Sequence, residues 1–144
     1  MRDEETAEIA VRAALLGRLV LSTVHTNDAL SAIDRLIDLG VAPYLLAATL
    51  RGVLSQRLVR RVCKSCAGQG CESCNNSGYK GRRVVSELMA VSAQGRKDIS
   101  AMAGGLPLDP DAEIRRFRTL RDAVHDLVAA GETTEAEWSR IVSL

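Results

Sequence analysis

The chain has 144 residues, of which 47% are hydrophobic, and this suffices for one ordinary domain, or one domain with a small satellite, around a buried core. Its 19 basic and 18 acidic residues nearly cancel, so net charge gives no argument for a nucleic-acid, membrane-surface or acidic partner. No apolar run approaches the roughly 18 residues that span a bilayer, and Met1-Arg2 leads straight into acidic residues where a signal peptide is apolar. We therefore expect a cytoplasmic protein without a transmembrane segment.

The first predicted element is an amphipathic helix over residues 3–16. Acidic residues crowd its first turn, and Gly17 stands where a C-terminal cap belongs. The stretch 19–24 follows at once and is apolar or β-branched apart from Ser22, and its lack of clean alternation predicts a strand covered on both faces of a parallel sheet. Helix and strand form the second half of a strand–helix–strand crossover, so the chain is expected to begin in mid-fold.

Small polar residues end this predicted strand and include His25, one of 2 histidines. In open α/β sheets, ligands bind beyond the carboxyl ends of the strands, where a histidine is well placed to meet an anion. The alternative is that His25 only hydrogen-bonds within its turn. Asn27 or Asp28 is expected to cap the next helix, because its side-chain oxygen can accept from unpaired backbone N–H groups.

Two helices, two strands and a further helix are expected in that order up to residue 103. The predicted bounds are helices over 31–39 and 44–55, strands over 56–62 and 82–91, and a helix over 94–102. The two strands flank a segment rich in glycine and turn formers, residues 63–81. That segment is therefore an excursion from the main body and not an independent domain.

Residues 104–144 are expected to form a helical tail. The expected starts of its helices are Asp109 with Pro110, Thr119 with Asp122, and Thr134 with Glu137. The last two pairs have the spacing of capping boxes. Trp138 is expected to anchor the apolar face of the last helix by packing.

All 4 cysteines fall in one short window, as the pairs Cys63-x-x-Cys66 and Cys71-x-x-Cys74. Each pair lets a tight turn aim two sulfurs at one point, so together they can close four thiolates around a tetrahedral zinc ion. Four protein ligands leave no open position, and such a site is structural rather than catalytic. A redox-active cysteine pair is the alternative. Redox chemistry needs only one C-x-x-C pair, however, and the strand–helix context of thioredoxin is missing. Left-handed turn conformations are expected at Gly68, Gly70 and Gly78.

Arginines flank this cysteine module and suggest a second interpretation, a zinc ribbon that contacts a nucleic-acid backbone. These arginines are Arg57, Arg60, Arg61, Arg82 and Arg83. Only Tyr79 offers a stacking ring nearby, and an arginine stripe is more often a solvated or subunit-contacting face. No nucleic-acid partner is therefore expected.

Several motifs, taken in order, resemble the secretion traffic ATPases, which are the type II secretion and type IV pilus assembly enzymes. Residues 1–7, MRDEETA, resemble the tail of that family's Walker B segment, and residues 21–29, LSTVHTNDA, resemble its histidine box. The stretch 56–63, the paired C-x-x-C motifs, residues 78–82 and residues 119–134 match its C-terminal region. The resemblance covers essentially the whole chain.

The resemblance implies an α/β fold, the C-terminal part of a RecA-like core of the P-loop NTPase class. The implied segments are this partial core (1–62), a zinc-binding insertion (63–81), a return strand and helix (82–103) and a helical tail (104–144). The family implies a cytoplasmic hexamer, peripheral to the bacterial inner membrane beside secretion or pilus platform components. It would use ATP and Mg²⁺ to move pilin-like subunits.

The resemblance also implies roles for individual residues. His25 would approach or sense the terminal phosphate of the nucleotide. Arg2 and Asp3 would lie beside the catalytic carboxylate, and Thr23 and Thr26 would belong to the neighbourhood of the nucleotide. The four cysteines would hold the family's zinc ion.

The sequence departs from the family pattern where the phosphates would bind. A phosphate-binding loop needs Gly-Lys followed by Ser or Thr, and none of Lys64, Lys80 and Lys97 follows a glycine. The family's catalytic glutamate would stand just before Met1, so the chain is expected not to hydrolyse ATP alone. The cysteine module is also shorter between its pairs than is usual in the family. The alternatives to an incomplete motor ATPase are a zinc-stabilised protein-interaction module and a zinc-ribbon nucleic-acid binder.

Overall fold

The computed structural model describes residues 1–143, which divide into two compact units. Unit 1 contains Met1–Leu54 and Leu88–Phe117, and unit 2 contains Ser55–Glu87 and the residues from Arg118 onward. The sheet has two strands, β1 (Gly52–Val62) and β2 (Tyr79–Ala90), and each strand contributes residues to both units. The two units are described in turn. The division into residues 1–62, 63–81, 82–103 and 104–144 follows motifs, and it stays a prediction.

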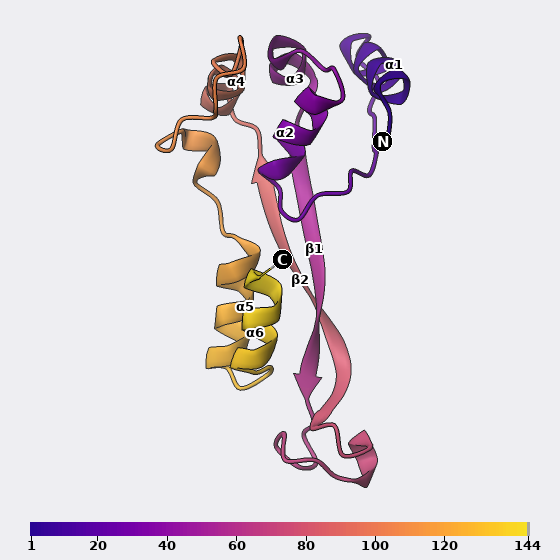
Figure 1. Ribbon diagram of the computed structural model, residues 1–144, viewed down its shortest axis with the longest axis vertical. Helices are drawn as coiled ribbons and strands as arrows, with labels where there is room; N and C mark the ends of the chain where they lie inside the picture. The colour runs from indigo at the N-terminus through magenta and orange to yellow at the C-terminus, as the bar shows by residue number, and fades with distance from the viewer. Residues whose placement is uncertain (144) are drawn as a thin grey trace. The chain divides into compact units, whose positions relative to one another are not determined.

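Unit 1 is built from four helices, which Figure 1 labels in chain order. They are α1 (Glu4–Leu15), α2 (Ser31–Asp38), α3 (Pro43–Thr49) and α4 (Ala93–Ser100). The expected C-terminal Gly17 takes a left-handed φ of +82°, and the structure adds an N-cap, the Asp3 carboxylate, which accepts from the Thr6 N–H at 2.8 Å. Helices and strand ends share one core, in which Ile33, Leu46 and Ile99 are buried.

Two expectations for unit 1 helices are wrong. The helix expected over residues 44–55 ends at Thr49, because pairing with β2 takes the chain from Gly52 onward into β1. The Val91 N–H donates to the Arg51 carbonyl at 2.9 Å at the start of this pairing, a long-range contact that a local apolar pattern does not reveal. The helix expected from Asp109 is only a 3₁₀ turn, Glu113–Arg115, because the Asp109 carboxylate accepts from the Asp111 N–H at 2.8 Å in a local turn.

The covered strand expected over residues 19–24 is also absent from the described structure. This segment is assigned to no strand, and Leu19 and Leu21 are 85% and 86% exposed. A buried strand needs hydrogen-bonded neighbours and cover on both faces, whereas the sheet of the described residues consists of β1 and β2 alone. The apolar pattern is therefore present without the partners that would bury it.

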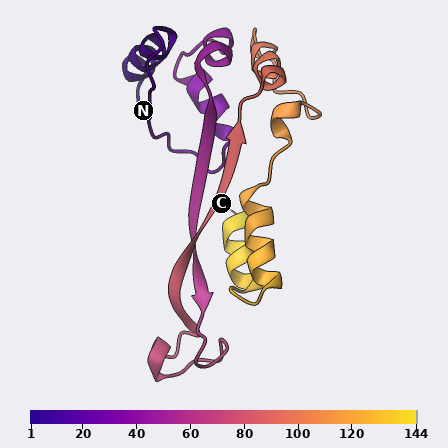
Figure 2. The ribbon, with the colours of Figure 1, turned by 180° about the vertical axis from the view of Figure 1, so that it is seen from behind.

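Unit 2 packs a pair of helices, α5 (Leu120–Ala129) and α6 (Glu135–Val142), against one face of the strand pair. The two helices lie side by side and antiparallel in both views (Figures 1 and 2). Val59 of β1 and Val85 of β2 point into the core that these helices complete, while their neighbours Leu58 and Val84 are exposed. This alternation is that of a sheet with one covered face. The buried residues of the core are Val59, Val85, Leu120, Ala123, Val124, Leu127 and Ile141.

The expected start of α5 is confirmed in detail. Thr119 Oγ1 accepts from the Asp122 N–H at 3.2 Å, and the Asp122 carboxylate accepts from the Thr119 N–H at 2.9 Å, which completes a capping box. The Thr119 N–H and hydroxyl, which both donate to the Asp122 carboxylate, lower the pKa of Asp122. Gly131 ends the helix with a φ of +67°. Among the described residues, no helix has both the length and the apolar character needed to cross a membrane.

Candidate functional site

The loop between β1 and β2 brings all four cysteine sulfurs together. The Sγ atoms of Cys63, Cys66, Cys71 and Cys74 lie within 4.8 Å of one another. The Sγ–Sγ distance is 4.0 Å between Cys63 and Cys71, and 3.8 Å from Cys74 to both Cys66 and Cys71. The thiols are free, and four Zn–S bonds of about 2.3 Å in a tetrahedron would place sulfurs about 3.8 Å apart. The cluster could therefore bind a metal such as zinc.

Backbone N–H groups point at two of the sulfurs. Gly70 donates to Cys66 Sγ at 3.2 Å, and Cys71 donates to Cys74 Sγ at 3.3 Å. Burial acts to raise the pKa of Cys74, but backbone hydrogen bonds from Cys71 and Gly78 lower this pKa to about 6. Burial and thiol hydrogen bonds raise the pKa of Cys71 to about 11. Backbone N–H donors such as those to Cys66 and Cys74 stabilise the thiolate, which is the form of cysteine that ligates a metal.

Gly78 closes the cysteine loop at its base. Its carbonyl accepts from the Cys63 N–H at 2.8 Å, and its φ is +76°. A Cβ atom on Gly78 would lie 2.4 Å from the Gly68 carbonyl oxygen, so no larger residue fits without moving the backbone. The left-handed conformations expected at Gly68 and Gly70 are present as well, with φ values of +88° and +97°.

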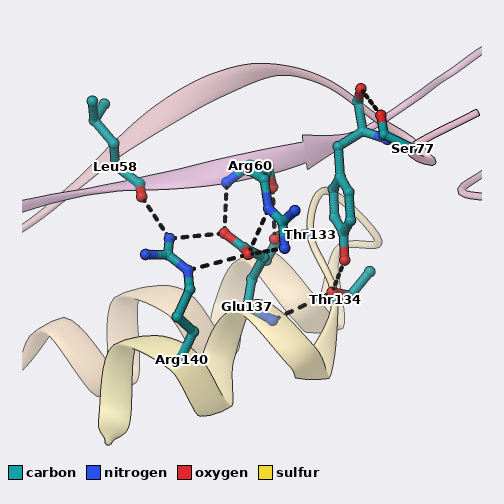
Figure 3. Close-up of polar contacts among 8 residues, drawn as sticks. Leu58, Arg60, Ser77, Thr133, Thr134, Glu137 and Arg140 are labelled. Atoms are coloured by element: carbon teal, nitrogen blue, oxygen red, sulfur yellow. Dashed lines mark hydrogen bonds and ion pairs between the residues drawn. The ribbon is translucent and has the colours of Figure 1, made fainter. Parts of the chain in front are cut away.

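Glu137 is the polar centre of unit 2, and its exposed fraction is 0% (Figure 3). Its carboxylate accepts from the backbone N–H of Arg60 at 2.9 Å and from Arg60 Nε at 2.8 Å. Arg140 Nη2 donates to the same carboxylate at 2.9 Å and to the Leu58 carbonyl at 3.0 Å. One buried carboxylate of α6 thus binds the backbone and a side chain of β1.

This arrangement corrects the capping box expected at Thr134. Thr134 does cap α6, since its hydroxyl accepts from the Glu137 N–H at 3.4 Å. The Glu137 carboxylate, however, turns inward to two arginines instead of back to the Thr134 N–H. Burial acts to raise the pKa of Glu137, but hydrogen bonds from Arg140 and Arg60 lower this pKa to about 2.

A second buried acid, Glu87 of β2, holds the start of α5. It is 3% exposed, and its carboxylate accepts from the Leu120 N–H at 2.7 Å. The sequence did not reveal the buried role of either glutamate, although a signal for Glu87 exists. In the alternation of β2 it shares a face with Val85 and Met89, which are buried. A carboxylate there needs a donor, and the free N–H groups at a helix start supply one.

The residues expected near a nucleotide all lie in unit 1, and His25, Arg2, Asp3 and Thr23 are exposed. The Met1 amino group donates to the Thr23 carbonyl, which holds the start of the chain beside this segment. The Asp3 carboxylate is engaged as the cap of α1. The half-buried Thr26 donates from its hydroxyl to the Asp28 carbonyl at 3.1 Å. Roles for these residues at a nucleotide stay predictions.

Of Asn27 and Asp28, Asp28 is the residue whose side chain binds the first residue of α2, while the N-cap position is Leu30, which has no side-chain cap. Its carboxylate accepts from the Ser31 N–H at 2.7 Å and from the Ser31 hydroxyl at 2.8 Å. The polar turn after residues 19–24 is therefore ordered by the start of α2.

The sequence is similar to proteins of known systems over nearly its whole length. The family described as Type II/IV secretion system protein matches residues 1–140. The chain is 42% identical over 149 aligned positions to the type II secretion system protein HxcR of Pseudomonas aeruginosa. This alignment covers 98% of this chain and 32% of the relative. It is 41% identical over 170 positions to the type IV pilus assembly ATPase PilB of Thermus thermophilus, covering 99% of this chain and 19% of the relative. The chain thus spans a third or less of the length of these curated relatives.

Solved structures agree with the sequence comparison. A crystal structure of the pilus retraction motor PilT with bound ADP matches 98% of this chain and 37% of that chain, with a TM-score of 0.75 and 26% identity. The Yersinia pseudotuberculosis ATPase DotB matches 99% of this chain and 35% of that chain, with a TM-score of 0.70, and at 19% identity it supports the fold alone. The mixed α/β architecture is therefore that of part of these ATPase structures. The chain belongs to the type II secretion and type IV pilus ATPase family.

Proposed function

We propose that the chain is the part of a secretion or pilus assembly motor ATPase that carries one wall of the nucleotide site. The observation that carries the proposal is the exposed apolar segment 19–24, which ends at His25 inside a family match over residues 1–140. Exposed Leu19 and Leu21 need cover in a folded protein, and further strands of a RecA-like sheet would supply it. His25 would then stand at the carboxyl end of a covered strand, where phosphates bind in such folds.

The nucleotide site in this proposal needs residues that the sequence does not contain. None of the lysines follows a glycine, so a phosphate-binding loop comes from other polypeptide. Arg2, Asp3, Thr23 and Thr26 line the neighbourhood of ATP and Mg²⁺ in the assembled enzyme. The assembled enzyme is a hexamer, peripheral to the inner membrane on its cytoplasmic side, that contacts secretion or pilus platform components.

The four cysteines hold a structural zinc ion in the proposed enzyme. The support is the sulfur spacing of 3.8–4.0 Å together with the two N–H donors to sulfur. Zinc bound by four thiolates has no open position for a water or substrate, so its role is to fold the loop.

A chimera tests the proposed motor function. Residues 1–144 replace the aligned third of HxcR, and ATP turnover is measured for the chimera and for the chain alone. We expect turnover only in the chimera, with a loss of roughly a hundredfold in His25→Ala because a group at the phosphate is removed. The matched control is His125→Ala, since His125 is exposed on α5.

Two results would contradict this proposal. Turnover by the chain alone, abolished by His25→Ala, would show that the chain contains a complete site. A chimera that keeps full turnover after His25→Ala would remove His25 from the nucleotide site.

A further inference from the structure

The two ends of the cysteine loop both contact the turn between α5 and α6. Val62 directly precedes the first cysteine, and its N–H donates to the Glu132 carbonyl at 2.9 Å. Tyr79 directly follows Gly78, and its hydroxyl is 2.7 Å from Thr134 Oγ1. The Glu132 carboxylate also forms an ion pair with Arg83 of β2. Each strand therefore contacts the turn that precedes α6 at the point where the strand meets the loop.

These contacts continue into the buried carboxylate (Figure 3). Thr134 is the N-terminal cap of α6, so the Tyr79 hydroxyl binds the residue that starts this helix. The Arg60 guanidinium lies 4.1 Å from the centre of the Tyr79 ring and donates to Glu137. A continuous set of contacts thus joins the loop base to the first turn of α6.

Local hydrogen bonds, such as that from the Cys63 N–H to the Gly78 carbonyl, and the cysteine cluster hold the loop, which has no apolar core of its own among the described residues. The described residues of the unit 2 core all lie outside residues 63–78. Contacts between protonated thiols are weak, whereas four thiolates around a metal contribute folding free energy directly. Metal loading therefore decides how firmly the loop base, with Val62 and Tyr79, is fixed.

From these contacts we infer that zinc in the cysteine cluster controls the docking of α6 on β1. Loading fixes Tyr79 and Val62, which hold the first turn of α6 in the position where Glu137 reaches Arg60. The two states are α6 docked and α6 locally released. By linkage, firm docking of α6 raises the affinity of the cluster for zinc by the same factor. This inference rests on the proposed zinc site.

Hydrogen exchange on the full chain tests the inference, with Zn²⁺ alone as the ligand. We expect removal of zinc by a chelator to speed amide exchange in α6 at least about fivefold, the lower end of typical coupling between sites. Exchange in α1 of unit 1 stays unchanged. Trp138 is the only tryptophan and lies on α6, so its fluorescence gives a second readout of the same release.

Tyr79→Phe removes the hydrogen bond to α6 from the loop side, and Thr134→Val removes it from the α6 side together with the cap on the Glu137 N–H, so each variant is measured with and without zinc. Tyr79→Phe and Thr134→Val are expected to bind one zinc per chain and to show a smaller zinc-dependent change in α6 exchange than the wild type. Tyr44→Phe is the matched control, because Tyr44 is exposed on α3, and it keeps the wild-type response.

Metal content, measured on the same samples, separates the possible failures. A zinc-loaded wild type whose α6 exchange is unaffected by the chelator overturns the coupling and leaves the zinc site intact. A full wild-type response in both Tyr79→Phe and Thr134→Val overturns it as well. A chain that binds no zinc overturns the coupling together with the proposed metal site.

Discussion

Glu137→Gln is the substitution that most directly tests how unit 2 is held together. It keeps the size of the side chain and removes its charge from a site with an exposed fraction of 0%. Hydrogen bonds from Arg140 and Arg60 lower the pKa of Glu137 to about 2, so the carboxylate is charged and bound at neutral pH. Loss of one partner of a buried ion pair costs about 3–5 kcal/mol. The Arg60 and Arg140 side chains are 51% and 47% exposed, so water can solvate them once the carboxylate is gone. We therefore expect the free energy of unfolding to fall by about 3 kcal/mol, the lower end of this range.

Urea unfolding followed by Trp138 fluorescence measures this loss, since Trp138 packs on the unit 2 core. Glu135→Gln is the matched control, an exposed glutamate in the same helix, and it should change the free energy of unfolding by less than about 0.5 kcal/mol. A Glu137→Gln variant as stable as Glu135→Gln would refute the assignment of Glu137 as the buried hub.

The same reasoning fixes the pH dependence. Glu137 has a folded-state pKa below its ordinary value, so its contribution is present above about pH 4.5 and is lost as pH falls toward about 2. The stability difference between wild type and Glu137→Gln should therefore shrink across this window. A difference that stays constant from pH 5 to about pH 2 would contradict the lowered pKa.

Three further substitutions test other parts of the account. Glu87→Leu leaves the buried Leu120 N–H without its acceptor and should lower the free energy of unfolding by about 1–3 kcal/mol in the Trp138 assay; an unchanged value would exclude Glu87 as the support of α5. Gly78→Ala should abolish stoichiometric zinc binding, because its Cβ would lie 2.4 Å from the Gly68 carbonyl. Gly81→Ala, with a φ of +81° but nothing within 4 Å, should keep zinc, and equal zinc content in both would refute the steric argument. Thr119→Ala removes the cap of α5 and should cost about 1 kcal/mol, whereas a neutral result would show that Asp122 alone suffices.

Local chemistry in the sequence predicts much of this structure. The caps at Gly17, Thr119 and Gly131 need only neighbouring residues, and each is found where its residue type indicates. The cysteine spacing likewise predicts four converging sulfurs, because two tight turns suffice to aim them.

What the sequence does not reveal is pairing between distant segments. The start of β1 at Gly52 depends on β2, some 30 residues later, and an apolar run of this length suits a helix equally well. The inward turn of Glu137 depends on Arg60 of β1, while its spacing from Thr134 indicates an ordinary capping box. The strand expected over residues 19–24 is wrong for the described structure, because a run of this composition forms a buried strand only with neighbours that pair with it, and Leu19 and Leu21 are exposed.

The metal content of the purified chain tests the central claim most directly. Elemental analysis should find one zinc per chain, lost in Cys63→Ser and in Cys74→Ser and kept in Ser65→Ala, an exposed neighbour in the same loop. Four thiolates at the observed sulfur spacing predict this stoichiometry. A wild-type chain that is folded by Trp138 fluorescence and contains no metal after purification in zinc would contradict it.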